Sequence, residues 1–229
     1  MASKQPAPRE PHLQYRLFEF DVDPAWVRKN NENQAEIRRL QVSAALLSLV
    51  LIGAGVGILV YSGMEPWGWL AVFGLGTVGV AVAAMIVVIP KKMGSMDHTY
   101  STSELVPAMI ADVRSRGITL MALVDQAVDR SRGSIPALTV RSCEKIPGID
   151  SPRVGQRVPA VAVAGNRAHS GGDNTYQFLS PLPIAWGTPK KRVVKAAEEQ
   201  IPGGEWETLR QNLDRVKEVE GTRTNVLPL

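Results

Sequence analysis

The residues best suited to chemistry lie together in one glycine-rich stretch: His169, Ser170 and Asp173. These residue types can form a nucleophilic triad, in which the histidine takes the serine proton and the aspartate orients the histidine. A triad needs its three side chains held by separate rigid elements, whereas these three are near neighbours between Gly165 and Asn174. The pattern therefore favours a solvent-exposed hairpin loop over a catalytic site.

The sequence patterns also give no support for a metal or cofactor site. His12, His98 and His169 are far apart in the sequence and lack the spacing of metal ligands. The chain has no GxxxxGK[ST] phosphate loop, no GxSxG elbow and no complete dinucleotide fingerprint. Cys143 is the only cysteine, so neither an intramolecular disulfide nor a cysteine zinc cluster can form. We predict a protein that is not an enzyme and holds no metal or cofactor.

The densest basic cluster lies at the start of a predicted helix. It comprises Lys190, Lys191, Arg192 and Lys195. The cluster could contact anionic lipid headgroups or an acidic partner, or it could be an ordinary solvated helix face. Nucleic acid is not expected, because the predicted strands offer mainly Tyr176 and Phe178 for base stacking.

Two apolar runs divide the chain, and they determine where every other element lies. Residues 42–62 contain no charge and, at about 1.5 Å per residue, are long enough to cross the hydrocarbon core of a bilayer. Residues 67–89 are equally free of charge and are followed by a proline and two lysines. We predict a two-helix transmembrane hairpin over residues 42–89.

The charges beside the spans predict the orientation of the hairpin, because Lys and Arg near the ends of a span stay in the cytoplasm. Such residues flank only the open end of the hairpin, and the turn carries none. We therefore expect a protein of the plasma membrane with both termini in the cytoplasm. The predicted interface residues are Arg38, Arg39, Lys91 and Lys92 on the inner side and Tyr61, Trp67 and Trp69 on the outer side.

Small residues on the spans form two pairs with GxxxG spacing, Gly53 with Gly57 and Gly79 with Ala83. Such pairs let helices approach closely. They could pack the two spans on each other or pack the hairpin against another membrane protein. Neither span contains Asp, Glu, Lys, Arg or His, so no ion pathway or haem-ligating histidine can be placed there.

The segment before the hairpin, residues 1–41, is predicted to begin as a loose arm. Apolar residues then alternate over 13–22 with a change of phase near Leu17, which predicts a bulged strand paired with the sheet of the later domain. Asp23 and Pro24 are typical of a helix start. No breaker follows before the first span, so one helix is expected from residue 24 to residue 61.

After a linker at residues 90–102, residues 103–220 predict a small cytoplasmic α+β domain, followed by a tail at 221–229. The domain should begin with a helix at 103–113 that Gly117 ends. Strands are predicted at 118–129, where a helix is the alternative, and at 138–142, 157–164 and 175–186. About four strands would form an antiparallel sheet or open barrel flanked by helices.

Two helices should complete the domain. The first is predicted at residues 190–201. The second presents Trp206, Leu209, Leu213 and Val216 on one face, which would dock on a core or on a partner.

Two sequence motifs and the preceding hairpin resemble a known family. The motifs are Arg157-Val-Pro-Ala-Val-Ala-Val-Ala-Gly165 and Tyr176-Gln-Phe-Leu-Ser-Pro-Leu-Pro-Ile-Ala-Trp186. Together they resemble an actinobacterial family of uncharacterised two-span membrane proteins with a C-terminal cytoplasmic domain. The resemblance implies no reaction and no catalytic residue. By size and topology the chain also resembles accessory subunits of the actinobacterial respiratory supercomplex, which joins the cytochrome bc complex to cytochrome c oxidase.

This resemblance implies a non-catalytic accessory or assembly subunit of an inner-membrane complex. Its expected partners are oxidase and cytochrome bc subunits, together with anionic lipids. The alternative is a membrane-tethered cytoplasmic module that binds a small ligand or lipid, which a deep apolar pocket among the strands would favour. An enzyme would require His169 to be buried beside a partner.

Overall fold

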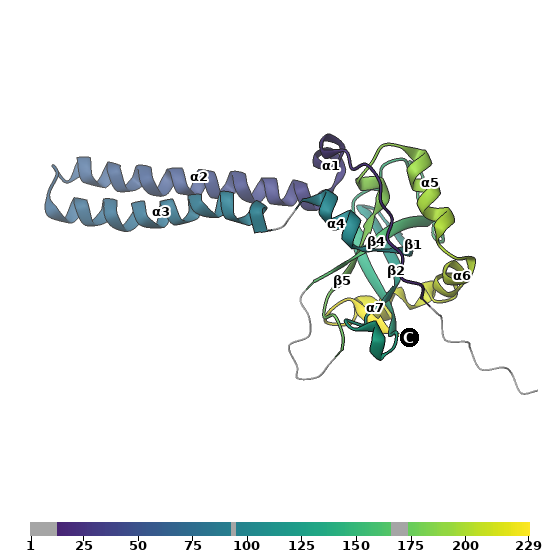
Figure 1. Ribbon diagram of the computed structural model, residues 1–229. Coiled ribbons are helices and arrows are strands. Elements are labelled where there is room, and N and C mark those ends of the chain that lie inside the picture. The colour runs from purple at the N-terminus through teal and green to yellow at the C-terminus, as the bar shows by residue number, and fades with distance from the viewer. Residues whose placement is uncertain (1–12, 93–94, 166–173) are drawn as a thin grey trace, which may run out of the picture. The chain divides into compact units, whose positions relative to one another are not determined.

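The computed structural model describes residues 13–92, 95–165 and 174–229. It consists of two units (Figure 1). One unit is a pair of long helices within residues 31–95, and the other is a domain with residues from both sides of this pair. The helix pair is therefore an insertion into the domain, which the chain begins before the hairpin and completes after it.

The inserted unit contains two antiparallel helices, α2 (Glu32–Tyr61) and α3 (Pro66–Lys92). Gly63 and Met64, both with a φ of +66°, reverse the chain between them. Pro66 begins α3 at the first helical position, where the missing N–H of proline breaks no helix hydrogen bond.

The two helices have the properties of membrane spans. Ile37–Tyr61 and Pro66–Ile86 are each long and apolar enough to cross a membrane. Large apolar side chains such as Leu49 and Leu70 lie exposed on the outside of the pair. The core helix of a water-soluble protein would bury these side chains. The predicted membrane hairpin is confirmed.

The single helix predicted from residue 24 to residue 61 is wrong, because the chain forms two helices here. α1 (Pro24–Asn30) starts as predicted, with Asp23 Oδ1 accepting a 3.0 Å hydrogen bond from the Trp26 backbone N–H. It ends at Asn30, whose side-chain amide donates to the Trp26 carbonyl at 3.0 Å. A side-chain amide that bonds the nearby backbone in this way competes with continuation of the helix, which makes Asn30 a favourable place for α1 to end.

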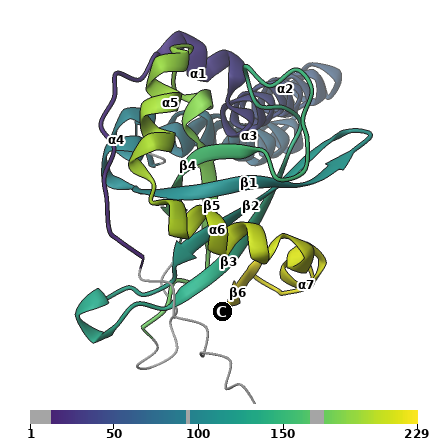
Figure 2. The same ribbon diagram turned by 90° about the vertical axis from the view of Figure 1, so that its right-hand side faces the viewer.

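The domain is built on a six-stranded antiparallel sheet with the strand order β5-β4-β1-β2-β3-β6. The strands are β1 (Glu104–Arg114), β2 (Gly117–Asp125), β3 (Pro136–Cys143), β4 (Arg157–Ala164), β5 (Leu179–Pro183) and β6 (Val226–Pro228). The Thr139 hydroxyl on β3 donates a buried 2.6 Å hydrogen bond to the Leu179 carbonyl on β5. β3 and β5 are not neighbours in the strand order, so this bond shows that the sheet curls and brings them together in a half-barrel (Figure 2).

The helix predicted at residues 103–113 is wrong, since this segment is the central strand β1. Residues 105–111 are all buried, and a strand covered on both faces loses the alternation of apolar and polar residues that identifies a strand. Gly117, predicted to end that helix, instead begins β2 with a φ of +139°. A Cβ at this position would lie 2.5 Å from the Cys143 carbonyl oxygen.

The four predicted strands correspond to β2, β3, β4 and β5, and the α+β class is confirmed. Residues 118–125 are a strand, not the alternative helix. β5 is shorter than predicted, because the 3-10 turn η2 (Ile184–Trp186) follows Pro183 directly.

Regular structure also lies outside the predicted domain bounds of 103 and 220. The predicted linker contains the helix α4 (Met96–Thr102). The predicted tail contains β6, which extends the sheet through the pairing of Val226 with Thr139 on β3. A strand of three residues is too short to produce a recognisable sequence pattern.

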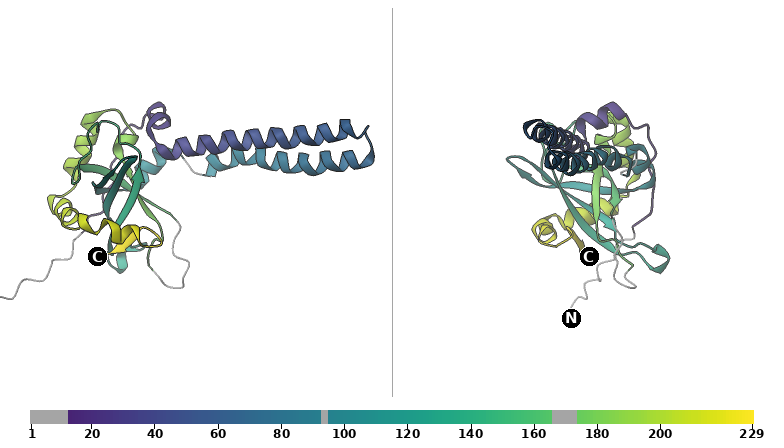
Figure 3. Two further views of the ribbon diagram at one scale, coloured as in Figure 1. Left: turned by 180° about the vertical axis from the view of Figure 1, so that it is seen from behind. Right: turned by 90° about the vertical axis from the view of Figure 1, so that its left-hand side faces the viewer.

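Three helices near the C-terminus cover the sheet: α5 (Lys191–Gln200), α6 (Gly203–Gln211) and α7 (Val216–Glu220). α5 packs on β4, α6 on β1 and β2, and α7 on β3 (Figures 2 and 3). The last predicted helix is thus not continuous, because Asn212 and the 3-10 turn η3 (Leu213–Arg215) separate α6 from α7.

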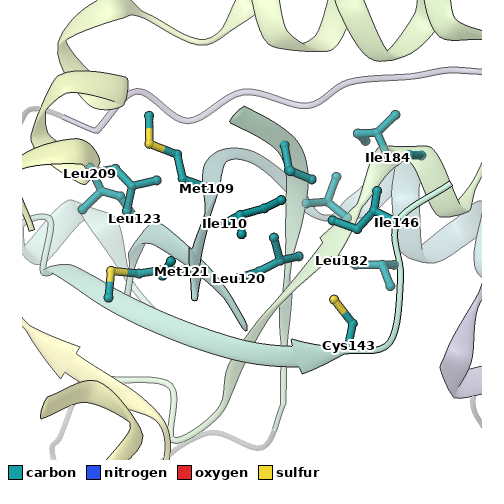
Figure 4. Close-up of a cluster of buried hydrophobic side chains, with 14 of the residues drawn as sticks. Met109, Ile110, Leu120, Met121, Leu123, Cys143, Ile146, Leu182, Ile184 and Leu209 are labelled. Carbon is teal, nitrogen blue, oxygen red and sulfur yellow. The ribbon is translucent and has the colours of Figure 1, made fainter. Parts of the chain in front are cut away.

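The main core lies between these helices and the sheet. Figure 4 shows Leu209 of α6 beside Met109 and Leu123 of the two central strands. The inner face of the curl instead carries small side chains, such as Ala108 paired with Ala122. Small residues on this face let the sheet curl tightly without leaving a void.

The segment before the hairpin completes the domain. Leu17 forms a single bridge with Glu104, and the Arg16 carbonyl accepts a 2.8 Å hydrogen bond from the Leu105 N–H. The predicted pairing with the later sheet is confirmed at this point, although the segment does not form a continuous strand. Arg16 also forms a bidentate ion pair with Glu205 of α6.

Candidate functional site

Three glycines lie at close-packed positions in the contact between the two spans. A Cβ at Gly79 would lie 2.8 Å from Ile52 Cγ1 on the facing helix, and one at Gly55 would lie 3.3 Å from the backbone of α3. Gly68 is as closely packed, near the turn, against Leu59. Of the predicted packing residues, Gly79 therefore packs the spans on each other, and Ala83, one turn further along α3, is half-buried.

Gly53 and Gly57 lie on the other side of α2. A Cβ at either position would meet no atom within 4 Å. Each is two residues from Gly55, which is about 200° around an α-helix. The first GxxxG pair thus takes no part in the packing of the hairpin and forms a shallow strip on its outer surface.

The predicted outer-interface residues surround the closed end of the hairpin. Tyr61 is 89% exposed, and Trp67 and Trp69 are about half exposed. Arg38 and Arg39 are exposed on α2, beyond the apolar run. The side chains of Lys91 and Lys92 lie outside the described residues.

In the domain, a groove of about 240 Å³ lies between α5, the start of β4 and the loop that joins β3 to β4. Its apolar lining includes Ile146, Ile149, Val158, Pro159, Ala185 and Val194. Its charged lining consists of Arg157, Lys191, Lys195 and Glu198. The groove is therefore apolar inside and carries three cations against one anion.

The local structure explains why these side chains meet. Lys191, Val194, Lys195 and Glu198 are spaced three or four residues apart and share one face of α5. Opposite them, the loop turns back at Gly148, whose φ is +84°. The buried side chain of Ile146 attaches this loop to the core.

The cations of the groove differ in how they are neutralised. Arg157 lies 3.5 Å from Glu198, with its guanidinium 5.1 Å from the centre of the Trp206 ring. Lys195 lies 3.7 Å from Glu199 at an exposed position. Within the described part of the chain, Lys191 forms no ion pair within 4 Å, unlike Arg157 and Lys195. The groove thus has a positive end at the start of α5.

A second hollow, of about 270 Å³, is more polar and lies between β3, β5 and the segment before β6. Arg141 contributes to its lining and places its guanidinium 4.8 Å from the centre of the Trp186 ring. Ser180 Oγ accepts a long hydrogen bond of 3.4 Å from Arg141. The arginine is thus already engaged by the domain.

A buried acidic cluster lies where β1 and β2 meet the turn before β3. Arg130 forms ion pairs with both Glu104 and Asp125. Burial raises the pKa of Glu104, and Arg130 offsets part of this rise. Asp125 Oδ1 accepts hydrogen bonds from the N–H groups of Ala127 and Ile135, both at 2.9 Å. These bonds close the loop between β2 and β3, which indicates a structural role.

Of the histidine, serine and aspartate candidates for catalysis or metal binding, only His98 lies in the described part of the chain. His12, His169, Ser170 and Asp173 lie outside the described residues, and His98 is exposed on α4. No group of three or more His, Cys, Asp or Glu residues that could hold a metal ion occurs among the residues the structure describes.

The partner face predicted around Trp206 is wrong, because this face packs inside the domain. Trp206 and Leu209 are buried, and Leu213 and Val216 are partly buried against the same core. The domain's own sheet occupies this face, so it is not available to a partner. The amphipathic pattern was consistent with either surface, because a helix face has the same composition whether a sheet or another protein covers it.

The groove contains residues that no sequence pattern had indicated. The basic cluster included Lys191 and Lys195, whose spacing of four residues placed them on one helix face. Arg157, Ile146 and Ile149 come from segments about forty residues earlier, and no local signal connects them to α5.

Comparison with known proteins identifies the family of the chain. The family model described as a protein of unknown function, DUF3239, matches residues 91–217. The chain belongs to this family. No curated protein matches it.

A solved structure is also similar, that of a putative membrane protein from Corynebacterium diphtheriae. The sequences are 43% identical over a region that covers 55% of this chain and 99% of the other, with a TM-score of 0.52. The predicted resemblance to uncharacterised actinobacterial membrane proteins is confirmed to this extent. A role in the respiratory supercomplex stays a prediction.

Proposed function

We propose that this protein is a non-catalytic accessory or assembly subunit of a larger membrane complex, held there through the outer surface of its hairpin. The observation that carries the proposal is the open strip at Gly53 and Gly57. Two glycines four residues apart remove side chains where a second helix would approach, and close backbone packing is a main source of helix association in lipid. The hairpin itself does not use this strip.

The absence of charge from both spans supports an accessory role. Transport and electron transfer within a membrane require ionisable side chains or metal ligands at depth. Residues 42–62 and 67–89 contain no Asp, Glu, Lys, Arg or His. A subunit built in this way contributes packing surface, while its partners perform the chemistry.

The specific partner that we propose is the respiratory supercomplex of cytochrome bc and cytochrome c oxidase, with both termini of the protein in the cytoplasm. The basic residues at the open end of the hairpin support this orientation. The similarity to a Corynebacterium protein supports an actinobacterial setting.

The test is purification of the full chain from native membranes in mild detergent, through a C-terminal tag, followed by mass spectrometry and a haem spectrum. We expect haem-containing bc and oxidase subunits to co-purify with the wild type. The Gly57→Leu variant should recover them at least about fivefold less, since losing one close helix contact in lipid costs on the order of 1 kcal/mol.

Two further variants serve as controls. Gly74→Leu introduces the same side chain at another open position, on α3, and should leave recovery unchanged. Gly79→Leu should disrupt the hairpin itself, because a Cβ there already approaches Ile52. Recovery of the protein without other subunits would refute the proposal, and equal losses with Gly57→Leu and Gly74→Leu would refute the role of the strip.

A further inference from the structure

The groove beside α5 has a chemistry that the proposed accessory role does not use. We infer that it binds an anionic phospholipid, with the phosphate at Lys191 and Lys195 and the glycerol and first acyl carbons over the apolar lining. The inference does not depend on which protein contacts the hairpin.

The charge of the groove favours an anionic group at one end. Lys191 and Lys195 line it from the first and fifth positions of α5. At the other end Arg157 is paired with Glu198, which leaves the excess positive charge near Lys191. α5 begins there with neither a side-chain cap nor an acidic residue in its first turn. The positive end of the helix dipole therefore adds to the two ammonium groups.

The apolar lining distinguishes a lipid from a free phosphate. Ile149 and Val194 are only partly buried by the domain, and they line the groove together with the buried Ile146 and Val158. A small phosphate ion would leave this lining in water, whereas an acyl chain would cover it, with a gain of about fourfold in affinity for each CH₂ buried. The volume of about 240 Å³ fits the headgroup region of a lipid and not two complete chains.

The connectivity of the chain supplies the lipid at high local concentration. The domain is joined covalently to both ends of a hairpin that enters a membrane. Tethering raises the local concentration of phospholipid around the domain, because it replaces an encounter in solution by one at a surface.

The binding experiment uses the full chain in nanodiscs of phosphatidylcholine alone, with isotope-labelled isoleucine methyl groups. Dihexanoyl phosphatidylglycerol, a soluble anionic phospholipid, is titrated while NMR follows Ile146 and Ile149. We expect saturable shifts of these two signals. Dihexanoyl phosphatidylcholine, glycerol 3-phosphate and inorganic phosphate should bind at least about tenfold more weakly, because each lacks the net charge or the acyl chains.

Variants test the site itself. Lys191→Gln combined with Lys195→Gln should weaken binding about tenfold, because each salt-screened surface contact contributes about threefold to fivefold. Arg192→Gln removes one positive charge from the same helix outside the groove and should change affinity less than about twofold. All three positions are exposed, so circular dichroism and the unfolding midpoint should match the wild type.

Each other outcome overturns the inference. Equal binding of inorganic phosphate would make the groove a site for a soluble anion. Unchanged affinity in the double Lys variant, or shifts absent from Ile146 and Ile149, would place lipid binding elsewhere. The double Lys variant should still co-purify the partners of the hairpin, so failure of this inference and failure of the proposed function give different results.

Discussion

The buried ion pair between Arg16 and Glu205 joins the two parts of the domain that the hairpin separates in sequence. Arg16 Nη1 donates to Glu205 Oε2 at 2.8 Å, Nη2 bonds the other carboxylate oxygen, and the Gln14 N–H adds a long bond of 3.4 Å. The side chains of Arg16 and Glu205 are only 12% and 5% exposed. Replacing Arg16 by Met would therefore leave a carboxylate buried without its countercharge.

The expected loss follows from this burial. Removing one partner of a buried pair costs about 3–5 kcal/mol. Because Arg16 retains some contact with water, we expect the low end, a loss of about 3 kcal/mol in the free energy of unfolding for Arg16→Met. Glu205→Leu should cost a similar amount, since it leaves the guanidinium unpaired. The double variant with Met and Leu restores a neutral, apolar contact and should lie within about 1 kcal/mol of the wild type.

The assay is urea unfolding of the full chain in detergent micelles, followed by tryptophan fluorescence. A local measurement accompanies it: hydrogen exchange at the Leu105 N–H, which donates to the Arg16 carbonyl. This exchange should become faster in Arg16→Met as the segment before the hairpin detaches. If the double variant is as unstable as the sum of the single ones, the two side chains act independently and the reasoning fails.

Three smaller changes test other parts of the domain. Burial raises the pKa of Glu104, so its contribution to stability is complete below its ordinary value of 4.5 and is lost as pH rises through the raised pKa. Glu104→Gln should make the free energy of unfolding depend less on pH over this range. An unchanged pH dependence would contradict the assignment to Glu104. Gly117→Ala should lower stability by about 2 kcal/mol, because the φ of +139° and the nearby Cys143 carbonyl both oppose a Cβ; a thermal midpoint equal to that of the wild type would exclude this strain. Thr139→Val should cost about 1–2 kcal/mol in urea unfolding, as the bond from β3 to Leu179 is lost, while a loss below about 0.5 kcal/mol would mean that this bond does not hold the curl.

The hairpin was predictable because its signal is local. Length, the absence of charge and flanking cations are properties of consecutive residues, and they place two spans without knowledge of the fold. The same is true of β4, whose bounds at 157–164 match the prediction, and of the helix start at Asp23. These features depend on neighbours in sequence.

β1 was mispredicted because its pattern depends on distant segments. It is covered on both faces, by α6 outside and by the small residues of the curl inside, so its apolar run shows no strand period. Gly117 could not distinguish a helix from a strand, because a glycine with a positive φ can end a helix or form the turn into β2. Likewise, the apolar face of Trp206 and Leu209 could not show whether a sheet or a partner covers it.

The candidate site was partly predictable for a similar reason. GxxxG spacing identifies a surface that can pack closely, but not which helix packs there, and the structure assigns Gly79 to the hairpin contact and leaves Gly53 and Gly57 outside it. Lys191 and Lys195 were visible as a basic cluster. The apolar half of the groove was not visible, because Ile146 and Ile149 reach α5 only through the fold.

The insertion of the hairpin bears directly on the open glycine strip. Residues before α2 and after α3 fold into one domain, so both ends of the hairpin are held by the same folded unit. This closure lowers the entropic cost of pairing the two spans, and Gly55, Gly68 and Gly79 already provide their close contact. The hairpin thus has no need of a second glycine face for its own stability. Under the proposed function a helix outside the chain packs against Gly53 and Gly57. The Gly57→Leu co-purification therefore distinguishes a subunit of a complex from a simple membrane tether.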